Sequence, residues 1–273
     1  MSTKNHPYHI VDPSPWPIST SFALLFVVLS SIALMREVAY SALFLCLTLI
    51  LLALCVGLWW RDVVKEAIVD KQHTSAVKSG LRMGMLLFIA SEVMFFAAFF
   101  GSIFKNKLLP NKALEGVWAQ KIVSWVPESY KYFDPLNIPL MNTFILLLST
   151  TTLFWAENAL KENNKTDLLR GLKYTILLGF IFTCFQVFEY VHAPFRLSDG
   201  VFTSDFYIAT GFHGLHVIVG TIFLGVCYVR SHLGHFDNGK SHLGLEFAAL
   251  YWHFVDVVWI LLFIFLYLWA AVN

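Results

Sequence analysis

Seven long apolar windows constrain this chain more than any other feature of its sequence. A helix that crosses the hydrocarbon core of a bilayer needs about 20 mostly apolar residues, and backbone groups in lipid are satisfied only within helices or closed barrels. Seven windows have roughly that length. The sequence therefore predicts an all-α membrane protein with seven transmembrane helices, over residues 18–34, 40–60, 80–104, 138–160, 172–190, 206–229 and 245–271.

Composition supports a polytopic membrane protein. The chain is 58% hydrophobic and only 14% charged, whereas a soluble domain has roughly 25% charged residues. The net charge of +1 gives no indication of a nucleic-acid partner. The four cysteines lie in apolar runs without a CxxC or Cys/His pairing, so neither a disulfide framework nor a zinc site is indicated.

The segments between the windows carry the prolines and most of the charges. Pro13, Pro15 and Pro17 are expected to keep the first helix from beginning earlier. Residues 60–80 form a charged, helical stretch that either lies along the interface or extends the second span into water. The longest polar connection, 105–137, contains Pro110, Pro127 and Pro135 and is predicted to be irregular.

The distribution of basic residues predicts the orientation in the membrane. Twelve of the nineteen lysines and arginines fall on the side of the N-terminus, and they lie in the shorter loops. The positive-inside rule therefore places the N-terminus inside and the C-terminus outside.

One acid, Glu92, lies within the apolar stretch "LFIASEVMFF" near the middle of the third window. A carboxyl group in hydrocarbon is expected to be neutral for much of the time. Such a group fits a proton-handling site, and it fits equally well a protonated acid that is hydrogen-bonded to a neighbouring helix or to lipid. In either case it should react with hydrophobic carbodiimides.

Further polar residues lie within the fifth, sixth and seventh windows. Within each of the pairs His213/His216 and His253/Asp256, a spacing of three places both members on one helix face. They are candidates for metal or haem ligands, but the absence of a second HxxH or ExxH motif favours a structural role in packing between helices. Gln186 and Glu189 are further intramembrane polar residues, and Gly211, Gly214 and Gly220 are expected to allow close approach of another helix.

Five motifs stand out in order along the chain: "HPYHIVDPSPWPIS" (6–19), "WWRDVVKEA" (59–67), "QHTSAVKSGLRMGMLLFIASEVMFF" (72–96), "ATGFHGLHVIVGTIF" (209–223) and "YWHFVDVVW" (251–259). Together they resemble subunit III of the haem-copper cytochrome c oxidases. The resemblance is spread over all seven windows, and only 105–137 and the tail after 259 are loosely covered.

The resemblance implies a single subunit III domain over 1–273, in which the first two helices (1–79) lean away from the other five (80–273). A V-shaped cleft between the two bundles would hold phospholipids. The resemblance assigns no redox centre, no catalytic residue and no metal to this chain, because haem and copper belong to partner subunits I and II. It further implies accessory subunits, a functional link to cytochrome c through the complex, and an energy-transducing inner membrane, mitochondrial or bacterial, with the N-terminus on the matrix or cytoplasmic side.

The role implied for this chain is to stabilise subunit I and to support proton uptake in a proton-pumping terminal oxidase that reduces oxygen. Glu92 matches the family's buried carbodiimide-reactive acid. Six residues match or lie near family positions that contact lipid head groups, and the resemblance implies that they bind lipid. The alternative for each is a side chain that only snorkels to the interface. The six are Trp60, Lys65, Glu66, His73, Arg230 and His235.

The chain also departs from the family pattern. Glu157 and Asn158 stand where the family usually has paired histidines, the segment 117–129 is longer, and 235–244 is altered. Three alternative functions remain open from the residues: subunit III of a quinol oxidase, a stand-alone proton-coupled transporter that uses Glu92, His213 and His253, and a haem- or metal-binding membrane enzyme.

Overall fold

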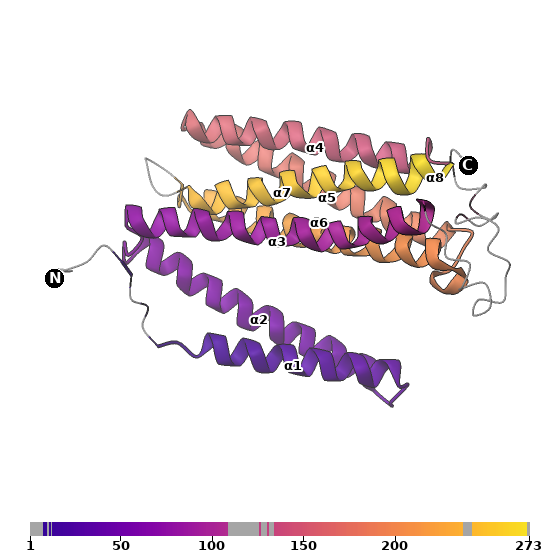
Figure 1. Ribbon diagram of the computed structural model, residues 1–273. Helices are drawn as coiled ribbons and strands as arrows, with labels where there is room; N and C mark the ends of the chain where they lie inside the picture. Colours follow the sequence, from indigo (N-terminus) through magenta and orange to yellow (C-terminus); the bar gives the residue numbers. More distant parts are fainter. Residues whose placement is uncertain are drawn as a thin grey trace. The chain divides into compact units, whose positions relative to one another are not determined.

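The predicted fold class is confirmed by seven helices that are long and apolar enough to cross a membrane (Figure 1). The computed structural model describes residues 8, 9, 11, 13–108, 126, 130, 134–236 and 242–271, and within them it contains no strand. The helices are α1 (Trp16–Met35), α2 (Ser41–Ile68), α3 (Ser75–Leu108), α4 (Ile138–Lys161), α5 (Lys165–His192), α6 (Val201–His232) and α7 (Leu243–Leu262), which continues through a π-helical segment (Phe263–Leu268) into α8 (Trp269–Ala271).

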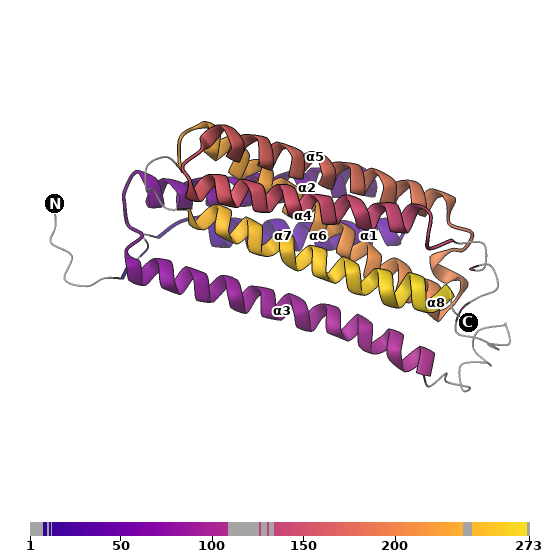
Figure 2. The same cartoon turned by 90° about the horizontal axis from the view of Figure 1, so that it is seen from above.

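The chain divides into two compact units, Met1–Leu81 and Arg82–Asn273. In the first unit α1 and α2 pack along each other, and the hydroxyls of Ser30 and Thr48 lie 3.0 Å apart across their contact. In the second unit α4 packs on α5, α5 on α6, and α7 on both α6 and α4 (Figure 2). The single domain with a V-shaped cleft remains a prediction.

Several helices extend beyond the predicted apolar windows, because an established helix gains one hydrogen bond for each added residue even where the side chains are polar. The α5 helix begins at Lys165 rather than at 172, and the Asn164 side chain caps it by accepting a hydrogen bond from the backbone N–H of Asp167 at 3.2 Å. The α3 helix begins at Ser75 rather than at 80. The apolar windows therefore locate the spans correctly but underestimate the length of the helices.

The charged stretch 60–80 is divided between two helices. Its first part extends α2 to Ile68, as one of the two alternatives predicted, but the prediction of a single helical stretch is wrong. Lys71 adopts a φ of 50°, and a left-handed residue interrupts a right-handed helix. The backbone N–H of Gln72 donates to the carbonyl of Glu66 at 3.1 Å, which turns the chain back toward the end of α2.

The connection between α3 and α4 is irregular by prediction, but residues 105–108 are helical and belong to α3. Most of the remaining connection lies outside the described residues. Tyr130 is described: its hydroxyl donates to the carbonyl of Leu266 at 2.8 Å, within the π-helical segment. Burial raises the pKa of the Tyr130 phenol, with a further contribution from Glu189.

Helix α1 begins at Trp16, directly after Pro15, so the prediction that Pro17 keeps the helix from beginning earlier is wrong. Pro15 precedes the first helical residue, Trp16, and Pro17 occupies the first turn. Proline is tolerated there because the first N–H groups of a helix have no partner within the helix.

The indole of Trp252 on α7 joins the other three helices of the second unit's core. A Cβ atom added to Gly179 on α5 would lie 2.6 Å from the indole, and one added to Gly220 on α6 would lie 2.9 Å from it. The indole N–H donates to the Ser149 hydroxyl on α4 at 2.9 Å. One fully buried side chain therefore contacts α4, α5 and α6 at once.

The three glycines predicted to permit close helix approach differ in outcome. The prediction is confirmed for Gly220, which faces Trp252. A Cβ atom at Gly211 would meet only the Tyr190 hydroxyl, at 3.9 Å, which is an ordinary contact. The prediction is wrong for Gly214, where an added Cβ atom would have no neighbour within 4 Å beyond its own helix in the described part of the chain.

Burial is distributed unevenly among the spans. In the most apolar window of the Leu243–Ala271 span 56% of residues are buried, whereas in those of α2 and α3 only 6% are buried. Because the exposed side chains of α2 and α3 are mostly large and apolar, these helices present surfaces suited to lipid or to other proteins.

We expect Gly220→Ala to destabilise the chain by about 1–3 kcal/mol, because the new methyl group overlaps the Trp252 indole in a closely packed core. Gly214→Ala is the matched control on the same helix, since its methyl group meets open space. Thermal unfolding in detergent measures both variants. Equal unfolding temperatures for the two would show that the indole has room to move.

Candidate functional site

Glu92 on α3 forms a close polar contact with His216 on α6. The carboxylate oxygen Oε2 lies 2.9 Å from the imidazole Nε2, and the two side chains are 20% and 12% exposed. Phe96 and Tyr251 flank the His216 ring, with centroid distances of 5.2 Å and 6.1 Å. The acid therefore has a specific partner on another helix, as one of the two predicted alternatives requires.

The second ring nitrogen of His216 is engaged within α6. Nδ1 is 2.6 Å from the carbonyl oxygen of Phe212, and because a carbonyl can only accept, Nδ1 carries a hydrogen. Nε2 is then the ring nitrogen that faces the Glu92 carboxyl group, and in a neutral imidazole of this tautomer it acts as a hydrogen-bond acceptor.

His213 has a different environment from His216, although only three residues separate them. Its side chain is completely buried, stacks on Trp259 at a centroid distance of 5.2 Å and meets the edge of Phe182 at 5.8 Å. Neither ring nitrogen has a hydrogen-bond partner among the described residues. The contacts of His213 are therefore those of aromatic packing, and not the interhelical hydrogen bonds that a structural role was expected to involve.

The two polar residues of α7, His253 and Asp256, also have different surroundings. Asp256 Oδ2 accepts a hydrogen bond from the Thr150 hydroxyl on α4. His253 stacks on Phe154 at a centroid distance of 4.6 Å, and its Nε2 lies 3.6 Å from Glu157 Oε2. Glu157 therefore faces His253, and the contacts of Asp256 and His253 both connect α7 to α4.

Glu189 on α5 is buried against the π-helical end of α7. Its Oε1 accepts a hydrogen bond from the Tyr267 hydroxyl at 2.6 Å, whereas Oε2 has no partner among the described residues. Gln186, one turn earlier, is also buried. The hydrogen bond between Glu189 and Tyr267 therefore connects α5 to the π-helical segment, whereas the amide of Gln186 has no hydrogen-bond partner among the described residues.

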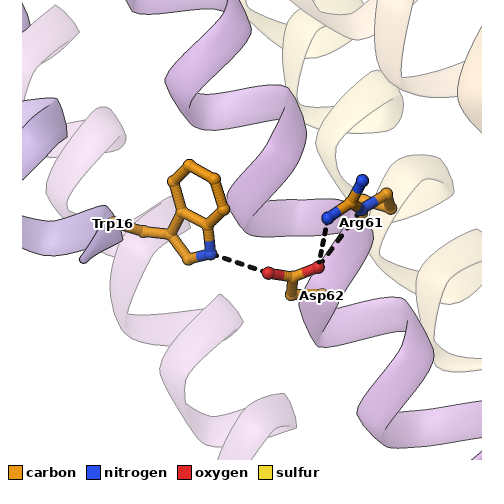
Figure 3. Close-up of polar contacts among 3 residues, drawn as sticks. All are labelled: Trp16, Arg61 and Asp62. Atoms are coloured by element: carbon orange, nitrogen blue, oxygen red, sulfur yellow. Dashed lines mark hydrogen bonds and ion pairs between the residues drawn. The ribbon is translucent and has the colours of Figure 1, made fainter. Parts of the chain in front are cut away.

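At the end of α2, Asp62 joins two helices of the first unit (Figure 3). The indole N–H of Trp16, the first residue of α1, donates to Asp62 Oδ2 at 2.7 Å. The Arg61 guanidinium donates to the other carboxylate oxygen through Nε at 3.1 Å and Nη2 at 3.0 Å. Both oxygens of the acid are therefore engaged, and the start of α1 is tied to α2.

The four residues of the first unit predicted to contact lipid head groups lie near the same end of α2. Trp60 and Lys65 are exposed, and Glu66 and His73 are half-buried. The structure adds a residue that the sequence prediction did not include: a ring nitrogen of His9, a carboxylate oxygen of Glu66 and a ring nitrogen of His73 all lie within 4.8 Å of one another.

The remaining two predicted head-group residues belong to the second unit. The guanidinium of Arg230, in the last turn of α6, is half-buried and lies 4.9 Å from the centre of the Phe236 ring. No acidic side chain of the described residues forms an ion pair with it, and its Nε is buried without a hydrogen-bond partner among them. The backbone N–H of His235 donates to the Arg230 carbonyl at 3.0 Å.

The candidate metal or haem ligands of α6 and α7 are not brought together. His216 contacts α3, His213 packs against α5 and α7, and Asp256 and His253 face α4. Among the described residues, the one group of three potential ligand atoms from different residues lies instead at His9, Glu66 and His73.

Sequence reasoning missed three partners that are distant along the chain. His216 is 124 residues from Glu92, and Trp16 is 46 residues from Asp62. His9 lies in the first resembling motif, so its presence in "HPYHIVDPSPWPIS" was the available signal. Nothing in the local sequence indicated that it meets Glu66 and His73.

Comparisons with known proteins agree along nearly the whole chain. Residues 6–271 match the family described as cytochrome c oxidase subunit III. A probable cytochrome c oxidase subunit 3 from Rickettsia felis is 53% identical over 270 residues, which cover 98% of this chain and 97% of the relative. Cytochrome c oxidase subunit 3 from Marchantia polymorpha is 44% identical (98% of each chain), and that from Scyliorhinus canicula is 45% identical (99% of this chain and 100% of the relative).

Proposed function

The chain belongs to the cytochrome c oxidase subunit III family, and from that premise we propose that it is a non-catalytic core subunit of a terminal oxidase. The family match over residues 6–271 carries this conclusion. In this role the chain stabilises subunit I and supports proton uptake, while electron transfer from cytochrome c to oxygen takes place on haem and copper in subunits I and II. The named relatives favour an oxidase of the cytochrome c type over one that oxidises quinol.

The contacts of the intramembrane polar residues favour a non-catalytic role for this chain. His216 and Asp256 are engaged by side chains of other helices, and His213 and His253 stack on aromatic rings. Groups used in this way stabilise the packing of the bundle. We further propose that the N-terminus lies on the matrix or cytoplasmic side of the inner or bacterial membrane, beside accessory subunits and bound phospholipid.

Phospholipid head groups are the proposed ligands of the interfacial residues. Arg230 supports this proposal because its charge is half-buried and lacks an acidic partner among the described residues, while a guanidinium can bind a phosphate with two parallel hydrogen bonds. In the first unit, Trp60, Lys65, Glu66 and His73 offer an indole, an ammonium group, a carboxylate and an imidazole near one end of α2.

The first experiment locates the redox centres. The complex is purified through a tag on this chain, and its reduced-minus-oxidised spectrum and metal content are measured before and after detergent removes the chain. We expect haem and copper to remain with the partner subunits and the isolated chain to be colourless. Haem that remains with the isolated chain would contradict the proposal and would return His213, His216, His253 and Asp256 to consideration as ligands.

Glu92→Gln should leave assembly and the haem spectrum intact, because the amide N–H can still donate to Nε2 of a neutral His216. We expect the variant to lose labelling of this chain by dicyclohexylcarbodiimide, since the reactive carboxyl group is gone, while oxygen reduction continues. Labelling and oxygen uptake are measured on the purified complex. Glu162→Gln is the control, since Glu162 lies exposed just after α4. Complete loss of oxygen reduction in Glu92→Gln would contradict a supporting role.

Arg230→Gln should reduce the phospholipid that remains with the purified complex, because the neutral amide loses the charge that attracts phosphate. Lipid mass spectrometry after identical detergent washing measures the difference. Arg170→Gln is a matched control, since Arg170 is exposed and is already paired with Asp167 at 3.3 Å. An unchanged lipid content in Arg230→Gln would assign this guanidinium to packing on Phe236 alone.

A further inference from the structure

Three segments of the first unit converge at His9, Glu66 and His73. His9 precedes α1, Glu66 lies in the last turn of α2, and His73 belongs to the connection between α2 and α3. One potential ligand atom from each lies within 4.8 Å of the other two, and all three residues are half-buried. The imidazole rings of His9 and His73 have centroids 6.4 Å apart and are inclined by 55°.

This donor set is one that zinc uses in proteins. Two imidazole nitrogens and one carboxylate oxygen bind Zn²⁺ in tetrahedral sites whose fourth position is open to water or another ligand. With metal–ligand distances of about 2.1 Å, the ligand atoms of such a site lie about 3.4 Å apart. The observed separations of up to 4.8 Å differ from this spacing by an amount that small side-chain rotations close.

Backbone hydrogen bonds hold two of the three ligands in place. The N–H of Gln72 donates to the carbonyl of Glu66 at 3.1 Å, and the N–H of Thr74 donates to the carbonyl of Gln72 at 3.0 Å. The residue between these two donors is His73. Because its backbone is fixed relative to Glu66, binding an ion costs little ordering of the chain.

We propose that His9, Glu66 and His73 form a binding site for one divalent transition-metal ion of the zinc class, which fastens the segment before α1 to the end of α2. This site differs from the sequence-based expectation of no metal in the chain, and it goes beyond the role in the oxidase.

Radioactive Zn²⁺ in equilibrium dialysis tests the proposal on the whole purified oxidase complex after chelator treatment. We expect the complex to bind one equivalent more than a complex with the His9→Gln and His73→Gln substitutions, at the same free Zn²⁺ and neutral pH. The extra equivalent should be lost at a pH of about 5, where imidazoles are protonated. His232→Gln is the matched control, because His232 is an exposed histidine in the last turn of α6.

A second variant tests the site in case the histidine substitutions impair assembly of the complex. Glu66→Gln removes one ligand with minimal change of shape and should weaken Zn²⁺ binding about 10-fold or more. In the unmodified complex, Zn²⁺ should also slow proteolysis of the segment before α1, and it should not do so in Glu66→Gln. Equal zinc stoichiometry in all the complexes, or equal protection by zinc with and without the Glu66 carboxylate, would overturn the proposal.

Discussion

The contact of Trp252 with two glycines is the constraint on which the core of the second unit depends. Helices in a bilayer gain little from the hydrophobic effect when they associate, since lipid tails are as apolar as their side chains. Close packing must supply the energy instead. The Trp252 indole fits between Gly179 and Gly220 only because neither residue has a Cβ atom, and its hydrogen bond to Ser149 fixes its direction.

With this core in place, the polar residues of α6 and α7 take up fixed directions. The helical spacing of three kept His213 and His216 broadly on one side of α6, yet one ring enters the aromatic core while the other reaches α3. Glu92 therefore has a polar partner on another helix, as ionisable residues within membrane spans usually do.

The fold class could be predicted from the sequence because the length and apolarity of a span are local properties. The ends of the helices could not be predicted, since segments that carry several polar residues, such as 165–171, continue a helix beyond the apolar window. The sequence predicted which residues belong to the candidate site, but it did not predict which of them contact one another. Glu92 and His216 were both recognised, yet their pairing depends on the rotation of α3 relative to α6, which no local pattern contains.

The first unit must be stabilised differently from the second, because its described residues form almost no apolar core. The buried residues of α1 and α2 are small: Ala23, Ser30 and Ser41. Their large apolar side chains point outward, where lipid or protein can cover them. What joins the two helices specifically is polar: the hydroxyls of Ser30 and Thr48 within the span, and Trp16 with Asp62 near its end. A metal ion at His9, Glu66 and His73 would add a third connection at the same end of α2.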